Sequence, residues 1–215
     1  MAGLNFIVLT GRFAAGKDTQ AAILEERLGS SSYIISTGDI YIGAKSGVGE
    51  YAHFYSFVTP YIDDIDIKGL LLPDRVMTQM VQEVITEKVN KGKETFIFTG
   101  FPRTVGQLEY FDEMITNFSD KFEVKSVFIE YKISDETSFE RSLKRRVEME
   151  GRGETPRPWD CNEGIAKRTL TYHNEIEPMI KNLKREGRLI EIDANKTIPE
   201  VETETSLKIF SKERM

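Results

Sequence analysis

The chain has 215 residues and a formal net charge of −6, and 40% of its residues are hydrophobic. This length supports one domain with a core large enough to fold unaided, and the composition excludes wholesale disorder. No apolar run approaches the ~20 residues that cross a bilayer, and the N-terminus lacks the basic start of a leader peptide. The lone cysteine, Cys161, excludes an internal disulfide. We therefore expect a cytoplasmic protein with no membrane or nucleic-acid partner.

Short apolar runs alternate with amphipathic segments, which favours an α/β fold with a parallel sheet covered by helices on both faces. Five runs predict strands, at Phe6–Thr10, Tyr33–Ile35, Thr95–Thr99, Val127–Ile133 and Leu189–Ile192. Helix signals lie between them: a helix from Gly16 to Gly29, one from Pro73 to about Asn90, one capped by Ser134, and one opened by a capping box of Asp160 and Glu163.

Two stretches do not fit this alternation. Residues Ile40–Leu72 are rich in glycine and aromatic residues without a convincing strand, and residues Glu148–Trp159 are polar with glycine and proline interruptions. Long excursions from a sheet are often lids over a binding site. We therefore expect a core of residues 1–39, 73–146 and 161–215, an inserted subdomain at 40–72, and a short mobile lid at 147–160.

The strongest local motif is G-R-F-A-A-G-K-D-T, from Gly11 to Thr19. Its G-x-x-x-x-G-K spacing follows an apolar strand and opens a helix, which is the context of a phosphate-binding loop. Backbone amides near Gly16 would cradle an anion, and Lys17 would reach the outer phosphates. Asp18 stands where the general motif has a hydroxyl, so the hydroxyl of Thr19 is offset by one. An ordinary strand-to-helix turn is the alternative that this context disfavours.

Further motifs follow in order: I-S-T-G-D (Ile35–Asp39), T-G-F-P-R-T-V-G-Q (Thr99–Gln107), E-R-S-L-K-R-R (Glu140–Arg146), R-P-W-D (Arg157–Asp160), K-R-T-L-T-Y-H (Lys167–His173) and A-N-K (Ala194–Lys196). Over nearly the whole chain, this ordered set resembles the adenylate kinase branch of the nucleoside monophosphate kinases. The resemblance implies a three-layer P-loop kinase fold with a five-stranded parallel sheet. It also implies a phosphotransferase that moves the γ-phosphoryl group of ATP, with Mg²⁺, onto AMP.

The resemblance also implies a role for each matching residue. ATP is expected to contact Ala14, Ala15, Gly16, Lys17, Asp18, Thr19, Arg141, Arg145 and Lys196. The insertion at 40–72 would bind the nucleoside monophosphate, together with residues outside it: Thr37, Leu70, Leu71, Leu72, Gly100, Phe101, Pro102, Arg103, Gln107, Arg157 and Arg168. The implied catalytic residues are Lys17, Arg103, Arg145, Arg157 and Arg168. Magnesium is expected at Thr19 and, through water, at Asp39.

The recurrence of arginine fits this chemistry. Phosphoryl transfer depends on positioning two polyanions and on stabilising charge, and permanently charged planar forks suit both tasks. The alternative for such a charge run is a solvated helix face. Arg141 and Arg145 share one helical face and can converge. We favour function for Arg141, Arg145, Arg157 and Arg168, and solvent exposure for Lys144, Arg146 and Arg152.

Several positions depart from the family's pattern. Ile42 stands where the family usually has an arginine that grips the acceptor phosphate, and Lys45, about one turn further, is the candidate substitute. Thr99 stands where an aspartate usually helps order water on magnesium, and Phe13 and Ala14 replace the usual proline and glycine. Without further cysteines, no zinc-stapled lid is expected.

The prediction is a monomeric kinase that transfers a phosphoryl group from ATP to AMP, because Thr37 and Gln107 suit the edge of adenine. One alternative is a kinase for UMP, CMP or another small phosphate acceptor. Another is a low-turnover nucleotide-binding module, which Ile42 and Thr99 favour and the retained arginines oppose. A regulatory GTPase is disfavoured, because Ile198 occupies the aspartate position of N-K-x-D.

Overall fold

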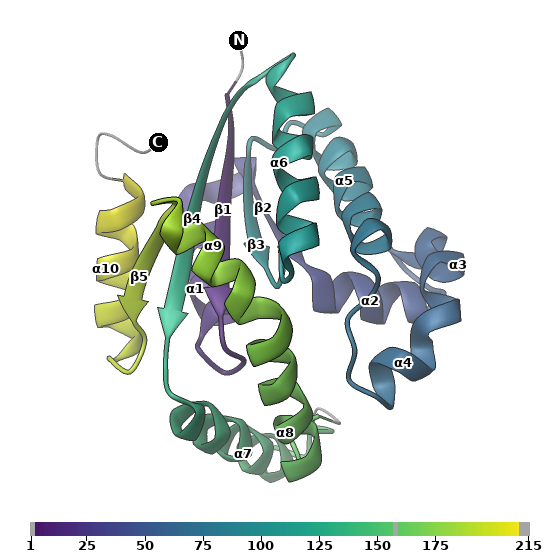
Figure 1. Cartoon of the computed structure of the whole chain (residues 1–215), viewed down its shortest axis with the longest axis vertical. Helices are drawn as coiled ribbons and strands as arrows, with labels where there is room; N and C mark the ends of the chain where they lie inside the picture. Colours follow the sequence, from purple (N-terminus) through teal and green to yellow (C-terminus); the bar gives the residue numbers. More distant parts are fainter. Residues whose placement is uncertain (1–2, 157–158, 211–215) are drawn as a thin grey trace.

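The computed structural model describes residues 3–156 and 159–210 (Figure 1). Within these residues, one parallel sheet has the strand order β2-β3-β1-β4-β5. The strands are β1 (Gly3–Gly11), β2 (Ser32–Ser36), β3 (Thr95–Thr99), β4 (Glu123–Lys132) and β5 (Leu189–Asp193). The predicted fold class and all five predicted strands are confirmed. Because β1 is central, the loop that follows it emerges in the middle of the sheet's carboxyl edge.

Helices cover both faces of the sheet. On one face lie α5 (Asp74–Asn90), α6 (Val105–Ser119) and α9 (Glu177–Arg185), which pack on Phe6 and Val8 of β1. On the other face lie α1 (Lys17–Leu28) and α10 (Ile198–Phe210), which pack on Ile7 and Leu9. Side chains alternate along a strand, so both faces of β1 are buried and its sequence reads as one continuous apolar run.

Two excursions flank the carboxyl edge of the sheet. After β2, the chain forms α2 (Thr37–Ser46), η2 (Ala52–Phe54), α3 (Tyr55–Val58), η3 (Thr59–Tyr61) and α4 (Ile62–Asp66). After β4, it forms α7 (Asp135–Gly151), α8 (Asn162–Thr171) and the π-helical turn η4 (Tyr172–Ile176). In Figure 1 the strands point toward α7 and α8, and α2 to α4 lie to the side of the same edge. The remaining short turn, η1 (Gly29–Ser31), joins α1 to β2.

Helix boundaries agree with the sequence signals in part. Ser134 caps α7, because its Oγ accepts a hydrogen bond from the backbone N–H of Thr137 at 3.1 Å. Helix α7 then continues to Gly151, into the stretch predicted to be loop. The predicted capping box at Asp160 is wrong, because Cys161 is the N-cap residue of α8 and the carboxylate of Asp160 is buried against arginine. None of the described helices is long and apolar enough to span a bilayer.

Candidate active site

The loop after β1 curls around the amine of Lys17. The Lys17 Nζ donates hydrogen bonds to the carbonyl of Gly11, at 3.0 Å, and to that of Arg12. Gly11 has a φ of +123°, and a Cβ there would lie 2.5 Å from the carbonyl oxygen of Tyr131, so the tight exit from β1 requires glycine. Gly16, with a φ of +87°, precedes the first turn of α1. The loop and the Lys17 amine therefore lie together at the N-terminus of α1, a position that suits phosphate binding.

Four cationic side chains from four segments influence one another here. Burial lowers the pKa of Lys17 to about 7; the Asp18 carboxylate opposes this, and the charges of Arg103, Arg168 and Arg145 lower the pKa further. Burial likewise lowers the pKa of the Arg103 guanidinium. Gathering like charges in a partly buried place is costly unless a polyanion compensates them, so the cluster is a candidate binding site for phosphates.

Two of these arginines meet at a buried carboxylate. Arg145 donates from Nε and Nη2 to the two oxygens of Asp160, at 2.7 and 2.6 Å. Arg168 Nη1 lies 3.8 Å from Oδ1 of the same residue, and Asp160 has no exposed surface. Asp160 thus ties α7 to α8 and sets the positions of both guanidinium groups. Sequence reasoning missed this role; the available signal was an acid, Asp160, that lies between Arg145 and Arg168 in a stretch of net positive charge.

The loop after β3 gathers most of the predicted acceptor residues. Thr37 Oγ1 donates to the carbonyl of Gly100 at 2.9 Å, and the Arg103 N–H donates to Gln107 Oε1 at 2.8 Å. A Cβ on Gly100 would lie 2.4 Å from Arg103 Nη2 and 2.7 Å from Thr37 Oγ1, so glycine allows the two side chains to meet. Phe101 and Pro102 are buried beneath this turn. The loop therefore presents one arginine and one amide side chain together.

The other predicted residues lie on several different segments. Arg141 donates to the carbonyl of Ala194 at 2.8 Å, beside the A-N-K turn, where Lys196 pairs with Glu204 at 2.8 Å. Ala14 and Ala15 lie in the phosphate loop, Thr19 is exposed on the first turn of α1, and Asp39 is exposed on the first turn of α2. Leu70 is exposed, Leu71 is half-buried and Leu72 is buried. Arg157 lies outside the described residues.

The candidate substitute for the missing acceptor arginine has another partner. Lys45 forms an ion pair with Asp66, and Tyr41 donates to the same carboxylate at 2.8 Å. Ile42 is 52% exposed on the same helix. Lys144, Arg146 and Arg152 each pair with a glutamate on the surface, in agreement with their predicted exposure.

Comparison with known proteins assigns the family. The sequence model of the adenylate kinase family matches residues 9–188. The chain belongs to the adenylate kinase family. It is 31% identical to an adenylate kinase of Thermobifida fusca, over 91% of this chain and 93% of that protein. It is 33% identical to an adenylate kinase of Corynebacterium glutamicum, over 87% and 94%, and 31% identical to one of Parvibaculum lavamentivorans, over 96% and 93%.

Membership in the adenylate kinase family makes the chain a phosphotransferase of the nucleoside monophosphate kinase type with a P-loop kinase fold. The resemblance to the adenylate kinase family, predicted from the ordered motifs, is confirmed. Among the described residues, no group of three or more histidine, cysteine, aspartate or glutamate side chains forms a metal cluster.

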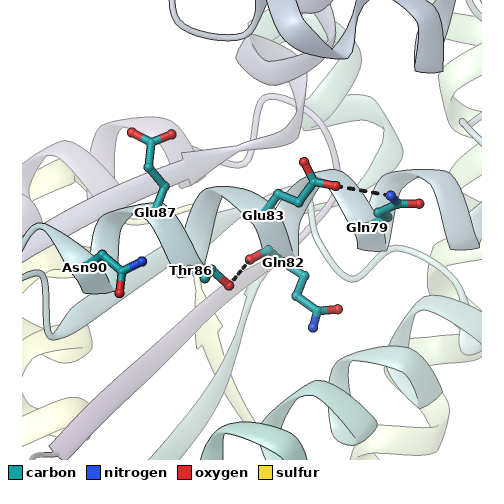
Figure 2. A pocket seen from close by; sticks show the side chains of 6 residues that line it. All are labelled: Gln79, Gln82, Glu83, Thr86, Glu87 and Asn90. Atoms are coloured by element: carbon teal, nitrogen blue, oxygen red, sulfur yellow. Dashed lines mark hydrogen bonds between the residues drawn. The ribbon is translucent and has the colours of Figure 1, made fainter.

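One surface hollow of this adenylate kinase family member lies away from the cationic cluster. It is lined along α5 by Gln79, Gln82, Glu83, Thr86, Glu87 and Asn90 (Figure 2). Within the hollow, Gln79 donates to Glu83 at 3.1 Å and Thr86 donates to the carbonyl of Gln82 at 2.8 Å. These described lining residues come from one helix and include two carboxylates and no cationic side chain, and Glu87 forms ion pairs with Lys91 at 2.6 Å and Lys88 at 3.4 Å, so the lining offers no group that would hold phosphate.

Proposed function

We propose that this adenylate kinase family member transfers the γ-phosphoryl group of ATP to AMP and forms two molecules of ADP. The observation that supports this most is the cationic cluster of Lys17, Arg103, Arg145 and Arg168, in which burial and mutual repulsion lower the pKa of the amine. A cluster of this kind stabilises two polyanions that repel each other. Thr37 and Gln107 support adenine as the acceptor base. The Thr37 hydroxyl donates to the carbonyl of Gly100, and Gln107 Oε1 accepts from the backbone N–H of Arg103, so both side chains lie at the loop after β3.

In this proposal, each segment has its own task. The loop at Ala14, Ala15, Gly16, Lys17, Asp18 and Thr19 holds the phosphates of ATP. Arg141 also contacts ATP, and the backbone of Lys196 lies near the adenine. Arg103 holds the acceptor phosphate, and Arg145, Arg157 and Arg168 stabilise the charge on the transferring group. The acceptor phosphate is already ionised, so no general base is required. Residues 40–72 would form the acceptor insertion and 147–160 the lid, whose closure excludes water.

Magnesium is part of the same proposal. Mg²⁺ prefers oxygen ligands and keeps several waters, and it is bound largely through the phosphates of its nucleotide. The Thr19 hydroxyl follows Lys17 on the exposed first turn of α1, and the Asp39 carboxylate lies on the exposed first turn of α2. Both supply oxygen, so the residues fit the ion: Thr19 would contact it directly and Asp39 through water. Bound there, Mg²⁺ would neutralise charge on the phosphates.

A coupled assay with MgATP and a panel of AMP, UMP, CMP, GMP and dAMP tests the proposal. We expect AMP to be preferred. A preference for UMP or CMP would show that AMP is not the acceptor. That alternative is motivated by Ile42, which replaces the usual arginine, and by Lys45, which is paired with Asp66. No transfer to any acceptor would favour a low-turnover nucleotide-binding module and overturn the proposal.

A further inference from the structure

Two side chains inside the phosphate loop point to a role that a phosphate cradle alone does not need. A cradle is built from backbone amides and one lysine, so the residues between Gly11 and Gly16 need no large side chains for it. Here Arg12 and Phe13 are both large, and both are mostly buried: the side chain of Arg12 is 14% exposed and Phe13 is 7% exposed.

Arg12 fastens the loop to two neighbouring elements. Its guanidinium forms an ion pair with Asp135 in the first turn of α7, and its Cζ lies 4.1 Å from the ring centroid of Tyr172 in η4. A planar guanidinium satisfies both contacts at once, because it can donate at its edge while stacking on its face. The carbonyl of the same residue accepts a hydrogen bond from Lys17 Nζ. Arg12 therefore connects the amine, α7 and η4.

Phe13 makes the matching connection to α8. The Cζ of Arg168 lies 4.6 Å from the centroid of the Phe13 ring. The backbone carbonyl of Phe13 accepts a hydrogen bond from the buried Ser138 Oγ of α7 at 2.7 Å. The ring thus lies under the guanidinium of Arg168, while the main chain beneath it is attached to α7. Because a ring attracts a cation to its face, Phe13 restricts where Arg168 can point.

We propose that Arg12 and Phe13 are positioning residues, which hold the phosphate loop in register with the arginines of α7 and α8. The inference rests on the proposed phosphotransfer. It also explains a departure from the family: proline fixes its own φ, whereas phenylalanine leaves the backbone free, so side-chain contacts must supply the order that proline would. Neither residue is assigned a contact with substrate.

The first test removes the ring face while keeping apolar bulk. Phe13→Leu should lower kcat about five- to tenfold and change KM for ATP by less than about twofold, because the displaced Arg168 acts on the transferring group. Phe13→Tyr, which restores a ring face, should recover most of kcat. The matched control is Phe210→Leu, since Phe210 packs under Arg27 at 4.9 Å on α10, and it should leave kcat unchanged.

Arg12 is tested in the same way. Arg12→Met should lower kcat about tenfold, and Arg12→Lys should recover little of it, because an ammonium cannot stack and fork together. Its control is Arg27→Met, which removes an arginine that donates to Ser206 at 2.6 Å and stacks on Phe210. In an Arg168→Met background, Phe13→Leu should have no further effect on kcat, because both changes act through one guanidinium.

A measurement independent of turnover separates this inference from the proposed function. The ring current of Phe13 should shift the Arg168 Nε–H resonance in ¹⁵N NMR spectra, and Phe13→Leu should remove that shift while Phe210→Leu leaves it. An unchanged resonance, or variants with the kcat of the starting chain, would overturn the positioning role. A starting chain that transfers no phosphoryl group but shows the shift would overturn the proposed function alone.

Discussion

The two sides of the sheet's carboxyl edge differ in how far their cationic side chains are neutralised by acids. On the side of the phosphate loop, α7 and α8, the guanidinium groups of Arg145 and Arg168 share the buried Asp160, and the pKa of Lys17 is lowered by the cations around it. On the side of residues 40–72, Lys45 pairs with Asp66 and Lys68 pairs with Asp64. One side holds more positive charge than its acids neutralise, and the other neutralises its lysines locally.

The insertion is anchored instead by aromatic contacts. Lys88 of α5 lies 4.6 Å from the ring centroid of Tyr33 and pairs with Glu50, and the Tyr33 and Tyr51 hydroxyls lie 3.0 Å apart. A Cβ on Gly43 would lie 2.9 Å from the Tyr51 ring, so glycine lets α2 approach it. Under the proposed function, the core and α8 would supply charge to both substrates, and residues 40–72 would supply shape.

Removing the amine of Lys17 should have the largest effect on activity. In Lys17→Ala, kcat/KM should fall about 10²- to 10³-fold, the usual cost of losing one preorganised electrostatic contact to the transition state. Steady-state kinetics with MgATP and AMP measure this. Lys144→Ala, which removes an exposed lysine paired with Glu148 at 3.9 Å, is the control and should retain its activity. Near-normal activity in Lys17→Ala would contradict the assignment of the phosphate loop.

The buried carboxylate should matter next. Asp160→Asn removes the charge that Arg145 binds with two hydrogen bonds, so the free energy of unfolding should fall by about 2–3 kcal/mol. Activity should fall as well, because the guanidinium groups of Arg145 and Arg168 lose the carboxylate that positions them both. Chemical denaturation measures the loss, and Glu154→Gln, which removes the exposed partner of Arg152, is the control. Equal stability of the two variants would show that Asp160 is not the link between α7 and α8.

The contrast between the two sides also marks how far the sequence predicts the structure. Strands and the phosphate loop follow from local patterns, because a buried parallel strand reads as an apolar run and the exit from β1 requires glycine at Gly11, where φ is +123°. The role of Asp160 is decided by contacts with α7 and α8, so a local rule assigned it to a cap. The partner of Lys45 likewise depends on where α4 places Asp66, far along the chain. Tertiary ion pairs leave no periodic trace in the sequence.

An arginine added to residues 40–72 would test whether this side of the sheet's edge can hold the acceptor phosphate. Ile42→Arg should lower KM for AMP about tenfold, because a charge-assisted hydrogen bond contributes roughly 1.5–3 kcal/mol and this position is partly exposed. KM for ATP should not change. Val48→Arg is the matched control, since it adds the same charge to the same insertion at a residue that is 71% exposed. If both variants lowered KM for AMP equally, general attraction rather than a directed contact would be the cause.

The smallest expected effect is a pH dependence confined to the charged side. The Nδ1 of His173 lies 2.7 Å from Glu177 and its Nε2 lies 3.2 Å from Asp135, which also pairs with Arg12. The carboxylate of Glu177 and then that of Asp135 raise the pKa of His173 above 6.5, against burial and the charge of Arg12. The protonated ring is therefore favoured in the folded state. Its contribution should be complete below pH 6.5 and should be lost as the pH rises through the raised pKa.

Because the ring of His173 is 39% exposed, the free energy of unfolding should fall by less than about 1 kcal/mol over that interval. Urea denaturation at closely spaced pH values measures the slope. His173→Gln should abolish it, and Glu177→Gln, which removes the stronger partner, should reduce it. If the slope persists in His173→Gln, another group titrates there, and the link between α7, η4 and the phosphate loop does not depend on this histidine.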